Sequence, residues 1–307
     1  MKTPPYLKSG DKIAIVAPAG KIAKDKIDTA IQTLESWGLK VIAGEYLFGS
    51  FHQFSATDDD RDIDFQKMLY NDSVRAILCA RGGYGSNRIV DYLEFTNLAK
   101  SPKWIIGFSD ITVFHSHIHT NFQVETIHGT MASGLNGDKK NNLSIDSLRK
   151  ALFGEKLNYQ LKAHPQNRKG NAEGLLTGGN LAILCSLIGT PSDIETSGKI
   201  LFIEDVGEYL YRLDRMMWQL KRAGKLENIA GLVVGGLTEM KDNETPFGKT
   251  AHEIISDCIR EYDYPVCFDF PAGHQDDNRA MIFGRNVRLE INDVVNLSFD
   301  SGEGNWL

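Results

Sequence analysis

The chain opens on an alternation of short apolar runs with segments of helical periodicity. Residues 12–17 form an apolar run that ends in a Pro-Ala-Gly turn, and residues 27–37 then carry apolar side chains at helical spacing. Residues 41–43 and 74–79 are further strand-like runs on either side of a second helical segment. This order predicts a doubly wound parallel sheet with helices on both faces, in which ligands bind beyond the carboxyl ends of the strands.

The length of 307 residues favours two domains, because most single hydrophobic cores stop growing below this size. We predict a doubly wound N-terminal domain over residues 1–140, a polar linker over 141–170 and a smaller mixed α/β domain over 171–307. Strands of the second domain are expected at residues 199–203, 229–234, 266–270 and 287–291, with a helix after Gly178-Gly179-Asn180. The fold class is therefore α/β in both halves.

Charge and cysteine content restrict the class of partner. The formal net charge of -6 argues against a nucleic-acid partner, which would require a basic face, so a small substrate is expected. The four cysteines lie in apolar surroundings without a C-x-x-C pair, which is typical of buried, reduced thiols (Cys79, Cys185, Cys258 and Cys267). The N-terminal residues lack the apolar core of a signal peptide, and no later run is long enough to span a bilayer. We therefore predict a cytoplasmic protein with no membrane partner.

A serine, a carboxylate and an imidazole each follow a strand-like run. Ser109 lies in the segment IGFSD, Glu204 in FIED and His274 in PAGH. A hydroxyl nucleophile needs a base to take its proton and a third group to orient that base, and these residue types fill those roles in serine hydrolases. Asp205 and Glu208 are alternative carboxylates, because the sequence alone does not show which side chains meet.

The surroundings of Ser109 predict a nucleophile elbow. Strand-like residues 104–106 lead into Gly107-x-Ser109, and helical periodicity follows at once. The start of a helix offers free N–H groups and positive potential beside the hydroxyl. The hydrolase pattern G-x-S-x-G has a glycine where this chain has Ile111, and serine is also a preferred N-cap. A simple helix cap therefore stays an alternative for Ser109.

A glycine-rich segment, Arg81-Gly82-Gly83-Tyr84-Gly85, follows the strand-like residues 74–79. It lacks the last glycine of a dinucleotide fingerprint, and no acidic residue ends a following strand at the expected distance, so nucleotide binding is weakly supported. Consecutive glycines leave N–H groups uncovered, as in an oxyanion hole or a carboxylate-binding nest, and Arg81 adds a bidentate donor for a carboxylate. An unspecialised turn is the alternative.

Three alternating histidines, His115, His117 and His119, invite a metal site. His115 and His119 share a helix face, but His117 points elsewhere and there is no H-E-x-x-H pattern. We expect packing or solvated histidines and no metal site. Cys79, at the end of a strand, is expected to be a buried thiol rather than a nucleophile.

Five ordered blocks of the sequence resemble the LD-carboxypeptidase (muramoyltetrapeptide carboxypeptidase) family of serine peptidases, which also includes microcin immunity peptidases. The likeness extends over almost the whole chain. The blocks are RGGYG at 81–85, GFSDIT at 107–112, GGNL at 178–181, EDVGE at 204–208 with YRLDR at 211–215, and PAGH at 271–274. One departure is HGT at 128–130, where many relatives have His-Gly-Pro.

The resemblance implies a catalytic triad of Ser109, His274 and Glu204 in a cleft between the two domains. It further implies a cytoplasmic homodimer that releases the terminal D-alanine from murein tetrapeptides during cell-wall recycling, by cutting the bond between the L-centre of a diamino acid and D-alanine. No metal or cofactor is needed in such an enzyme.

The expected mechanism assigns roles to the glycine-rich segment and the elbow. Backbone N–H groups of Asp110 and Gly83 are expected to hold the oxyanion. Arg81 or the glycines, including Gly82, are expected to bind the free carboxylate of D-alanine.

Two other functions stay open from the sequence. One is a microcin-immunity-like hydrolase of peptidyl or aminoacyl nucleotides, which would need an aromatic platform for the base. The other is a non-catalytic protein that binds a small molecule on a doubly wound fold, in which Ser109 is only a helix cap.

Overall fold

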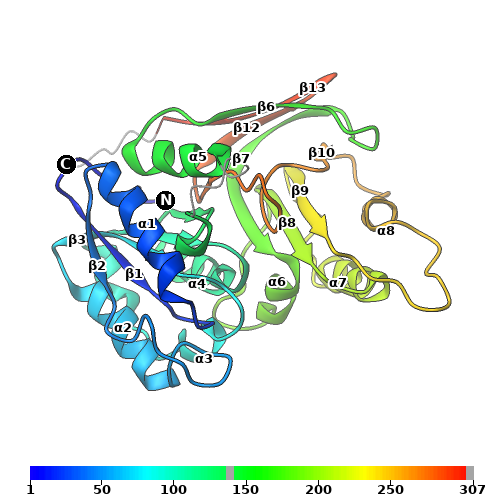
Figure 1. Ribbon diagram of the computed structural model, residues 1–307. Coiled ribbons are helices and arrows are strands. Elements are labelled where there is room, and N and C mark those ends of the chain that lie inside the picture. Colours follow the sequence, from blue (N-terminus) through cyan, green and yellow to red (C-terminus); the bar gives the residue numbers. More distant parts are fainter. Residues whose placement is uncertain (136–141, 302–307) are drawn as a thin grey trace.

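The computed structural model describes residues 1–135 and 142–301. Two sheets lie side by side in Figure 1: β1 to β3 of the first are blue to cyan, and the strands of the second run from green (β6 and β7) to red (β13). The first sheet is six-stranded and the second seven-stranded, and helices accompany both. The predicted α/β class, a doubly wound domain joined to a mixed one, is confirmed. No helix within the described residues is long and apolar enough to cross a membrane.

The first sheet has the strand order β11-β5-β4-β3-β1-β2, and all its neighbours are parallel except β11 on β5. Its strands are β1 (Lys12–Val16), β2 (Lys40–Ala43), β3 (Val74–Cys79), β4 (Trp104–Gly107), β5 (Thr126–His128) and β11 (Met281–Phe283). The α-helices of this half are α1 (Lys24–Ser36), α2 (Asp58–Tyr70), α3 (Ser86–Ile89) and α4 (Thr112–Phe122). Short 3-10 turns span Phe95–Ala99, Ser109–Ile111 and Ala132–Gly134.

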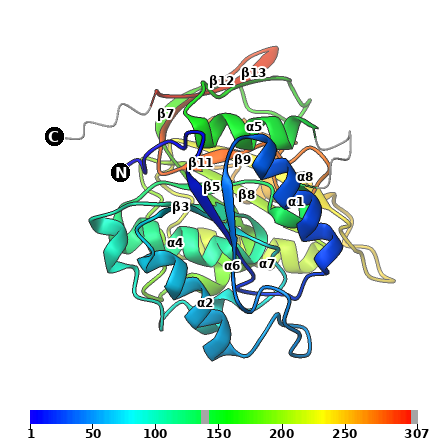
Figure 2. The same cartoon turned by 60° about the vertical axis from the view of Figure 1, so that its left-hand side comes forward.

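Alternate residues of β1 pack on opposite faces of the first sheet. Ile13 and Ile15 belong to the buried cluster that includes residues of α1. Ala14 and Val16 belong to a different cluster, which contains buried residues of α2 and α4. Because both faces are covered, the strand is apolar at successive positions, as the run at 12–17 predicts. Figure 2 shows α1 and α2 on different sides of β1.

The strand order reverses at β1. The chain places β2 on one side of β1, while β3, β4 and β5 follow on the other side. The loops after β1 and β3 meet beyond this point, where the Gly20 N–H donates to the Gly82 carbonyl oxygen at 3.1 Å. In open parallel sheets such a reversal opens a crevice at the carboxyl ends of the strands, and ligands bind there.

The second sheet has the order β10-β9-β8-β7-β12-β13-β6. Strands β7 to β10 are parallel, whereas β12, β13 and β6 add antiparallel pairs. Its strands are β6 (Asn158–Lys162), β7 (Gly170–Asn180), β8 (Ile200–Val206), β9 (Gly231–Thr238), β10 (Val266–Cys267), β12 (Asn286–Ile291) and β13 (Val294–Phe299). The remaining α-helices are α5 (Asn142–Phe153), α6 (Leu181–Leu187), α7 (Leu210–Arg222) and α8 (Ala251–Cys258).

The span predicted as a linker, 141–170, contains α5 and β6, while residue 141 and the polar stretch 136–140 lie outside the described residues. Helix α5 was not predicted because polar residues surround its few apolar ones in the sequence. Its buried side is formed by residues such as Leu148 and Leu152, which lie one turn apart. Strand β6 pairs with β13 at the edge of the second sheet. The domain boundaries at 140 and 171 stay a prediction.

Strands β7, β11 and β13 and helices α7 and α8 were not predicted. Glycines break the apolar pattern of β7, and at Gly178 a Cβ would lie 1.9 Å from the Phe202 carbonyl oxygen of β8. Strand β11 is only three residues long, yet it returns the chain to the first sheet beside β5. The C-terminal part of the chain therefore completes the N-terminal sheet.

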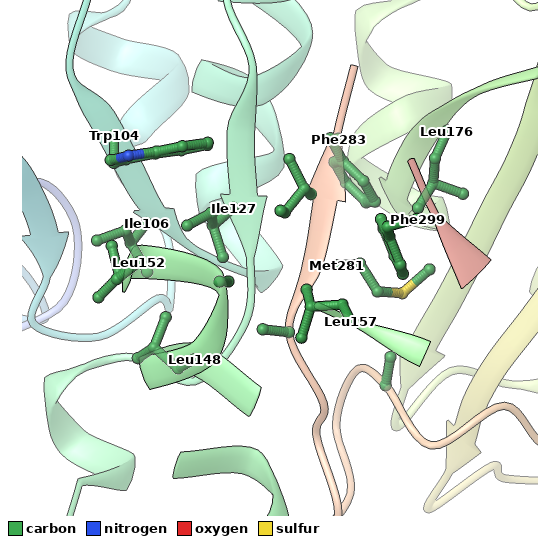
Figure 3. Packing of buried hydrophobic residues seen from close by; sticks show 14 of the residues in the cluster. Trp104, Ile106, Ile127, Leu148, Leu152, Leu157, Leu176, Met281, Phe283 and Phe299 are labelled. Carbon is green, nitrogen blue, oxygen red and sulfur yellow. The ribbon is translucent and has the colours of Figure 1, made fainter. Parts of the chain in front are cut away.

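One hydrophobic core joins the two halves. Figure 3 shows Ile106 of β4 beside Leu152 of α5, with Trp104 farther along the same strand, and Phe283 of β11 toward the second sheet. The same cluster continues to buried residues of the second sheet, including Leu176, Leu289 and Phe299. The two halves are thus packed against each other through apolar contacts that exclude water.

Beside this core, Arg285 forms a buried ion pair that joins the two sheets. It follows β11, and its guanidinium donates to both carboxylate oxygens of Glu125, with side-chain exposures of 6% and 5%. It also donates to the Tyr6 hydroxyl at 2.8 Å. We predict that Arg285→Met lowers the free energy of unfolding by about 3 kcal/mol or more, because it leaves a buried carboxylate unpaired.

Chemical denaturation with a matched control measures this effect. Arg288→Met removes a similar pair, with Glu173 at 3.2 Å, but both side chains are more than half exposed. That change is expected to cost under about 1 kcal/mol. Equal effects of the two substitutions would contradict a special role for the buried pair.

Candidate active site

Ser109 lies at a sharp turn after the end of β4. Its φ of 63° is in the left-handed region, which is uncommon for a residue with a Cβ and marks a strained backbone. The turn continues as a 3-10 segment into α4. The predicted strand, turn and helix are therefore present. The departure at Ile111 is accommodated by Gly107, where a Cβ would lie 2.8 Å from Cγ1 of Ile111.

The hydroxyl of Ser109 does not cap the following helix. The N-cap residues of the 3-10 turn and of α4 are Phe108 and Ile111, and neither end has a side-chain capping bond. Instead, Oγ of Ser109 lies 3.1 Å from Nε2 of His274. The geometry thus favours the nucleophile over the simple cap among the two interpretations of this serine.

His274 is oriented by Glu204. Nδ1 of the imidazole lies 2.7 Å from Oε2 of Glu204, and the backbone N–H of His274 donates to the same oxygen at 3.1 Å. Gly273 permits this approach, because its φ is 99° and a Cβ there would lie 2.6 Å from that oxygen. Thr238 donates from Oγ1 to the His274 carbonyl at 2.6 Å. The imidazole is therefore held with Nε2 directed at Ser109.

Of the three candidate carboxylates, Glu204 is the one hydrogen-bonded to the imidazole. It is fully buried near the end of β8. Asp205 accepts from the amide of Asn180 at 3.0 Å and from a backbone N–H at the start of α6, so it anchors that helix. Glu208 forms an ion pair with Arg212.

The environment of His274 favours its protonated form. Burial lowers the pKa of the imidazole, but the hydrogen bond and charge of Glu204, with the charges of Asp205 and Glu239, outweigh burial and raise the pKa above the ordinary 6.5. An imidazole of this kind accepts a proton readily. This is the property that a general base requires.

The glycine-rich segment faces Ser109. A Cβ on Gly82 would lie 3.0 Å from Cβ of Ser109 and 3.5 Å from the backbone N of Asp110. Among the described residues, the N–H groups of Gly83 and Asp110 have no acceptor within the protein. Uncovered N–H groups on both sides of a nucleophile are what an oxyanion hole needs.

A cleft of about 470 Å³ opens over these groups. Among the residues that the structure describes, its lining carries three cationic side chains, Lys21, Lys26 and Arg81, and no carboxylate. The other lining residues are Ile22, Ala23, Gly82, Gly83, Phe108, Ser109, Met131, Ser133 and His274. A cationic cleft in a chain of net charge -6 predicts an anionic ligand. A larger hollow of 550 Å³ between α7 and α8 contains none of these residues.

Sequence reasoning missed Lys21, Lys26, Met131 and Ser133 of this lining. The two lysines follow β1 at the reversal of the strand order, which the structure shows and which no local motif marks in the sequence. Arg81 lies at the cleft, as predicted, and its Nη1 donates to the Lys21 carbonyl at 3.1 Å.

The alternating histidines have separate partners. Nε2 of His115 pairs with the Gly107 carbonyl at 2.9 Å, Nδ1 of His117 with Ser192 and Nε2 of His119 with Thr126. Within residues 1–135 and 142–301, no group of His, Cys, Asp or Glu has a metal-binding arrangement. All four cysteines are buried, and burial raises the pKa of the thiol of Cys79 above its ordinary value.

Two family models match the sequence. Residues 13–129 match the LD-carboxypeptidase N-terminal domain, and residues 173–289 match the LD-carboxypeptidase C-terminal domain. The chain is 36% identical over 289 residues to a probable murein peptide carboxypeptidase of Bacillus subtilis, covering 93% of this chain and 91% of that protein. It is 30% identical to the murein tetrapeptide carboxypeptidase of Pseudomonas aeruginosa, covering 92% and 94% of the two chains.

Solved structures share the fold. The muramoyltetrapeptide carboxypeptidase of Oxalobacter formigenes superposes with a TM-score of 0.86 at 29% identity, covering 94% of this chain and 98% of that one. The microcin C7 self-immunity protein in complex with aspartyl sulfamoyl adenosine has a TM-score of 0.88 at 19% identity, with 98% of each chain covered. The second likeness concerns the fold alone.

The alternative of a non-catalytic binding protein is therefore wrong, since the two domain matches together span most of the chain and the two relatives named above are carboxypeptidases. The chain belongs to the LD-carboxypeptidase family and is a serine-type peptidase.

Proposed function

We propose that this protein releases the terminal D-alanine from murein tetrapeptides through a triad of Ser109, His274 and Glu204. The observation that carries the proposal is the continuous hydrogen-bonded chain from Ser109 through His274 to Glu204, located in a cationic cleft. The names of similar proteins support the substrate class, because two of them are murein peptide or murein tetrapeptide carboxypeptidases.

In the proposed mechanism, Nε2 of His274 takes the Ser109 proton as Oγ attacks the scissile carbonyl carbon. Glu204 keeps the imidazole in the tautomer that accepts this proton and stabilises the imidazolium that forms. His274 then protonates the nitrogen of the leaving D-alanine as the acyl-enzyme forms. A water that gives its proton to His274 attacks the acyl-enzyme and releases the shortened peptide.

We assign the oxyanion to the backbone N–H groups of Asp110 and Gly83. Both flank Ser109, and neither is used within the described part of the protein. Such donors strengthen their hydrogen bonds as charge develops on the oxygen, so they act on the transition state more than on the bound substrate.

The cations of the cleft suit a substrate with several carboxylates. We assign the carboxylate of D-alanine to Arg81, whose guanidinium lies beside the glycine-rich segment. The remaining carboxylates of a murein peptide would face Lys21 and Lys26. A nucleotide conjugate is less well supported, because Phe108 is the one phenylalanine, tyrosine or tryptophan in the described part of the cleft lining. Its ring packs edge-on against His274.

A cytoplasmic homodimer acting in cell-wall recycling stays part of the proposal. It rests on the family resemblance.

We predict that the wild-type protein removes one alanine from a murein tetrapeptide ending in D-alanine, and that Ser109→Ala lowers kcat by at least about 10⁴-fold while keeping the fold. Mass spectrometry of the product and circular dichroism measure the two effects. Ser133→Ala is the matched control, because Ser133 also lines the cleft but has no place in the triad. If Ser109→Ala released alanine at the wild-type rate, Ser109 would not be the nucleophile.

If the wild-type protein does not cut the tetrapeptide, an aminoacyl-adenylate analogue is the next substrate to test.

The pH dependence tests the base. Because Glu204 raises the pKa of His274, kcat/KM is expected to fall as the pH drops below that raised pKa, where the imidazole is already protonated. Glu204→Gln removes the charge that favours imidazolium, so the acidic limb moves to lower pH, and kcat falls by up to about 10⁴-fold. Rate profiles from pH 4 to 9 measure both. A limb that stays in place would transfer the role to another carboxylate, beginning with Asp205.

Arg81→Gln tests carboxylate recognition. We predict that it raises KM about tenfold with little change in kcat, because a charged contact to the leaving D-alanine is lost from the bound substrate. A tetrapeptide ending in D-alaninamide should respond much less to the same substitution. The control is Lys24→Gln, which removes one positive charge from an exposed residue outside the cleft. If Arg81→Gln changed KM equally for the tetrapeptides ending in D-alanine and in D-alaninamide, the assignment of Arg81 to the carboxylate would be contradicted.

A further inference from the structure

The proposed mechanism does not use the buried guanidinium of Arg61, which lies beside the glycine-rich segment. Arg61 lies on α2 and is 1% exposed. Removing a guanidinium from water costs free energy unless its donors find acceptors. Nη1 donates to the carbonyl of Pro18, after β1, and to the carbonyl of Gly85 at 3.0 Å, while Nη2 pairs with Asp58. One side chain thus links the loops that follow β1 and β3.

The guanidinium packs tightly against the glycine-rich segment. Gly85 has a φ of 149°, and a Cβ at this position would lie 2.5 Å from Nη1 of Arg61. The ring of Phe54 lies 5.0 Å from the guanidinium carbon. The segment is therefore fixed at Gly85 by a group that cannot move without disturbing α2.

A second buried charge ties the same segment to the nucleophile. Asp110 follows Ser109 directly and is 1% exposed. Its Oδ2 accepts the backbone N–H of Ser86 at 2.8 Å. Burial raises the pKa of this carboxyl, and the charge of Arg61 acts in the opposite direction, so the two charges interact.

Gly83 lies between two residues, Gly82 and Gly85, whose carbonyl oxygens accept hydrogen bonds from other parts of the chain. On one side the Gly82 carbonyl accepts from Gly20, and on the other the Gly85 carbonyl accepts from Arg61. A segment of successive glycines has little stiffness of its own, so its position must come from these contacts.

We infer that Arg61 and the side chain of Asp110 are positioning residues, which hold the glycine-rich segment over Ser109 and so place the Gly83 N–H in the oxyanion hole. The inference rests on the proposed function. Neither side chain touches the substrate. Their effect is carried by the backbone of residues 82–86, and it acts on the transition state, where the oxyanion hole is filled.

The test compares two arginines that share one acidic partner. The guanidinium of Arg88 also binds Asp58, at 2.8 Å, but this side chain is 48% exposed, and unlike that of Arg61 it has no bond to the carbonyl of Pro18 or Gly85 among the described residues. Arg61→Lys keeps the charge but cannot serve both carbonyls in the same geometry, so kcat on the murein tetrapeptide is expected to fall tenfold or more, about the scale of a displaced catalytic group, with KM changed less than about twofold. Arg88→Lys is expected to keep both constants within about twofold.

A transition-state analogue separates positioning from a purely structural role. A murein peptide whose scissile carbonyl is an aldehyde adds the Ser109 hydroxyl across its C=O bond, with the proton passing to the new oxygen or to His274, and the adduct fills the oxyanion hole. Arg61→Lys should weaken inhibition by this aldehyde by about the factor lost in kcat/KM, and should leave the affinity for the product tripeptide unchanged. Asp110→Asn, which keeps the size of the side chain, should also weaken inhibition by the aldehyde, to a smaller degree, and leave the affinity for the product unchanged. This variant replaces Arg61→Lys in the test if Arg61→Lys does not fold.

The outcomes distinguish the inference from the function beneath it. A wild-type protein that neither cuts the tetrapeptide nor binds the aldehyde would overturn the proposed function. A wild type that cuts the tetrapeptide, with Arg61→Lys and Asp110→Asn retaining wild-type kcat and aldehyde affinity, would overturn the inference alone. Parallel losses of aldehyde and product affinity in the folded variants would also overturn it, because they indicate a general distortion of the cleft.

Discussion

The hydrogen bond between Glu204 and His274 is the interaction on which the candidate site depends. A fully buried carboxylate is costly unless it is paired, and Glu204 uses one oxygen for both the imidazole and the backbone N–H of His274. This double contact fixes the position of the loop as well as the ring. Gly273 is required because the loop must approach the carboxylate more closely than any side chain allows. The contacts of the loop therefore set the orientation of the imidazole.

Ser109 belongs to the first sheet and its two partners to the second half of the chain, so the site requires a fixed relation between the halves. The fold provides it at β11, which pairs with β5 in the first sheet and is followed by Arg285 on Glu125. Strand β12 then re-enters the second sheet. Because the loop with His274 precedes β11 by a few residues, the crossing also carries the imidazole to Ser109. The chain segment that crosses at β11 therefore both connects the two halves and brings His274 to Ser109.

Local patterns predicted the apolar strands and helices of the first half, but missed the regular elements α7 and β13 as well as elements whose place is decided by tertiary contacts. Strand β3 has the predicted limits, whereas β7 was missed because its glycines admit the backbone of β8. The residues of the proposed triad could be named from their positions after strands, but their convergence depends on β11, which is too short to be recognised from the sequence. Lys21 and Lys26 were missed for a related reason, since their place at the cleft comes from the reversal of strand order at β1. The order of strands in a sheet cannot be inferred from the local sequence.

The glycine-rich segment and the elbow at Ser109 differ in what their backbones need from the surrounding structure. The elbow holds Ser109 at a φ of 63°, and the surrounding packing must maintain this strain. The segment at 82–85 has the reverse difficulty, because glycines accept almost any conformation and need external contacts to adopt one. Arg61 and Asp110 provide such contacts from the interior, where water cannot compete for their hydrogen bonds. A flexible backbone held by buried charges presents N–H groups at close range without side chains in the way, and this is what a small oxyanion hole demands.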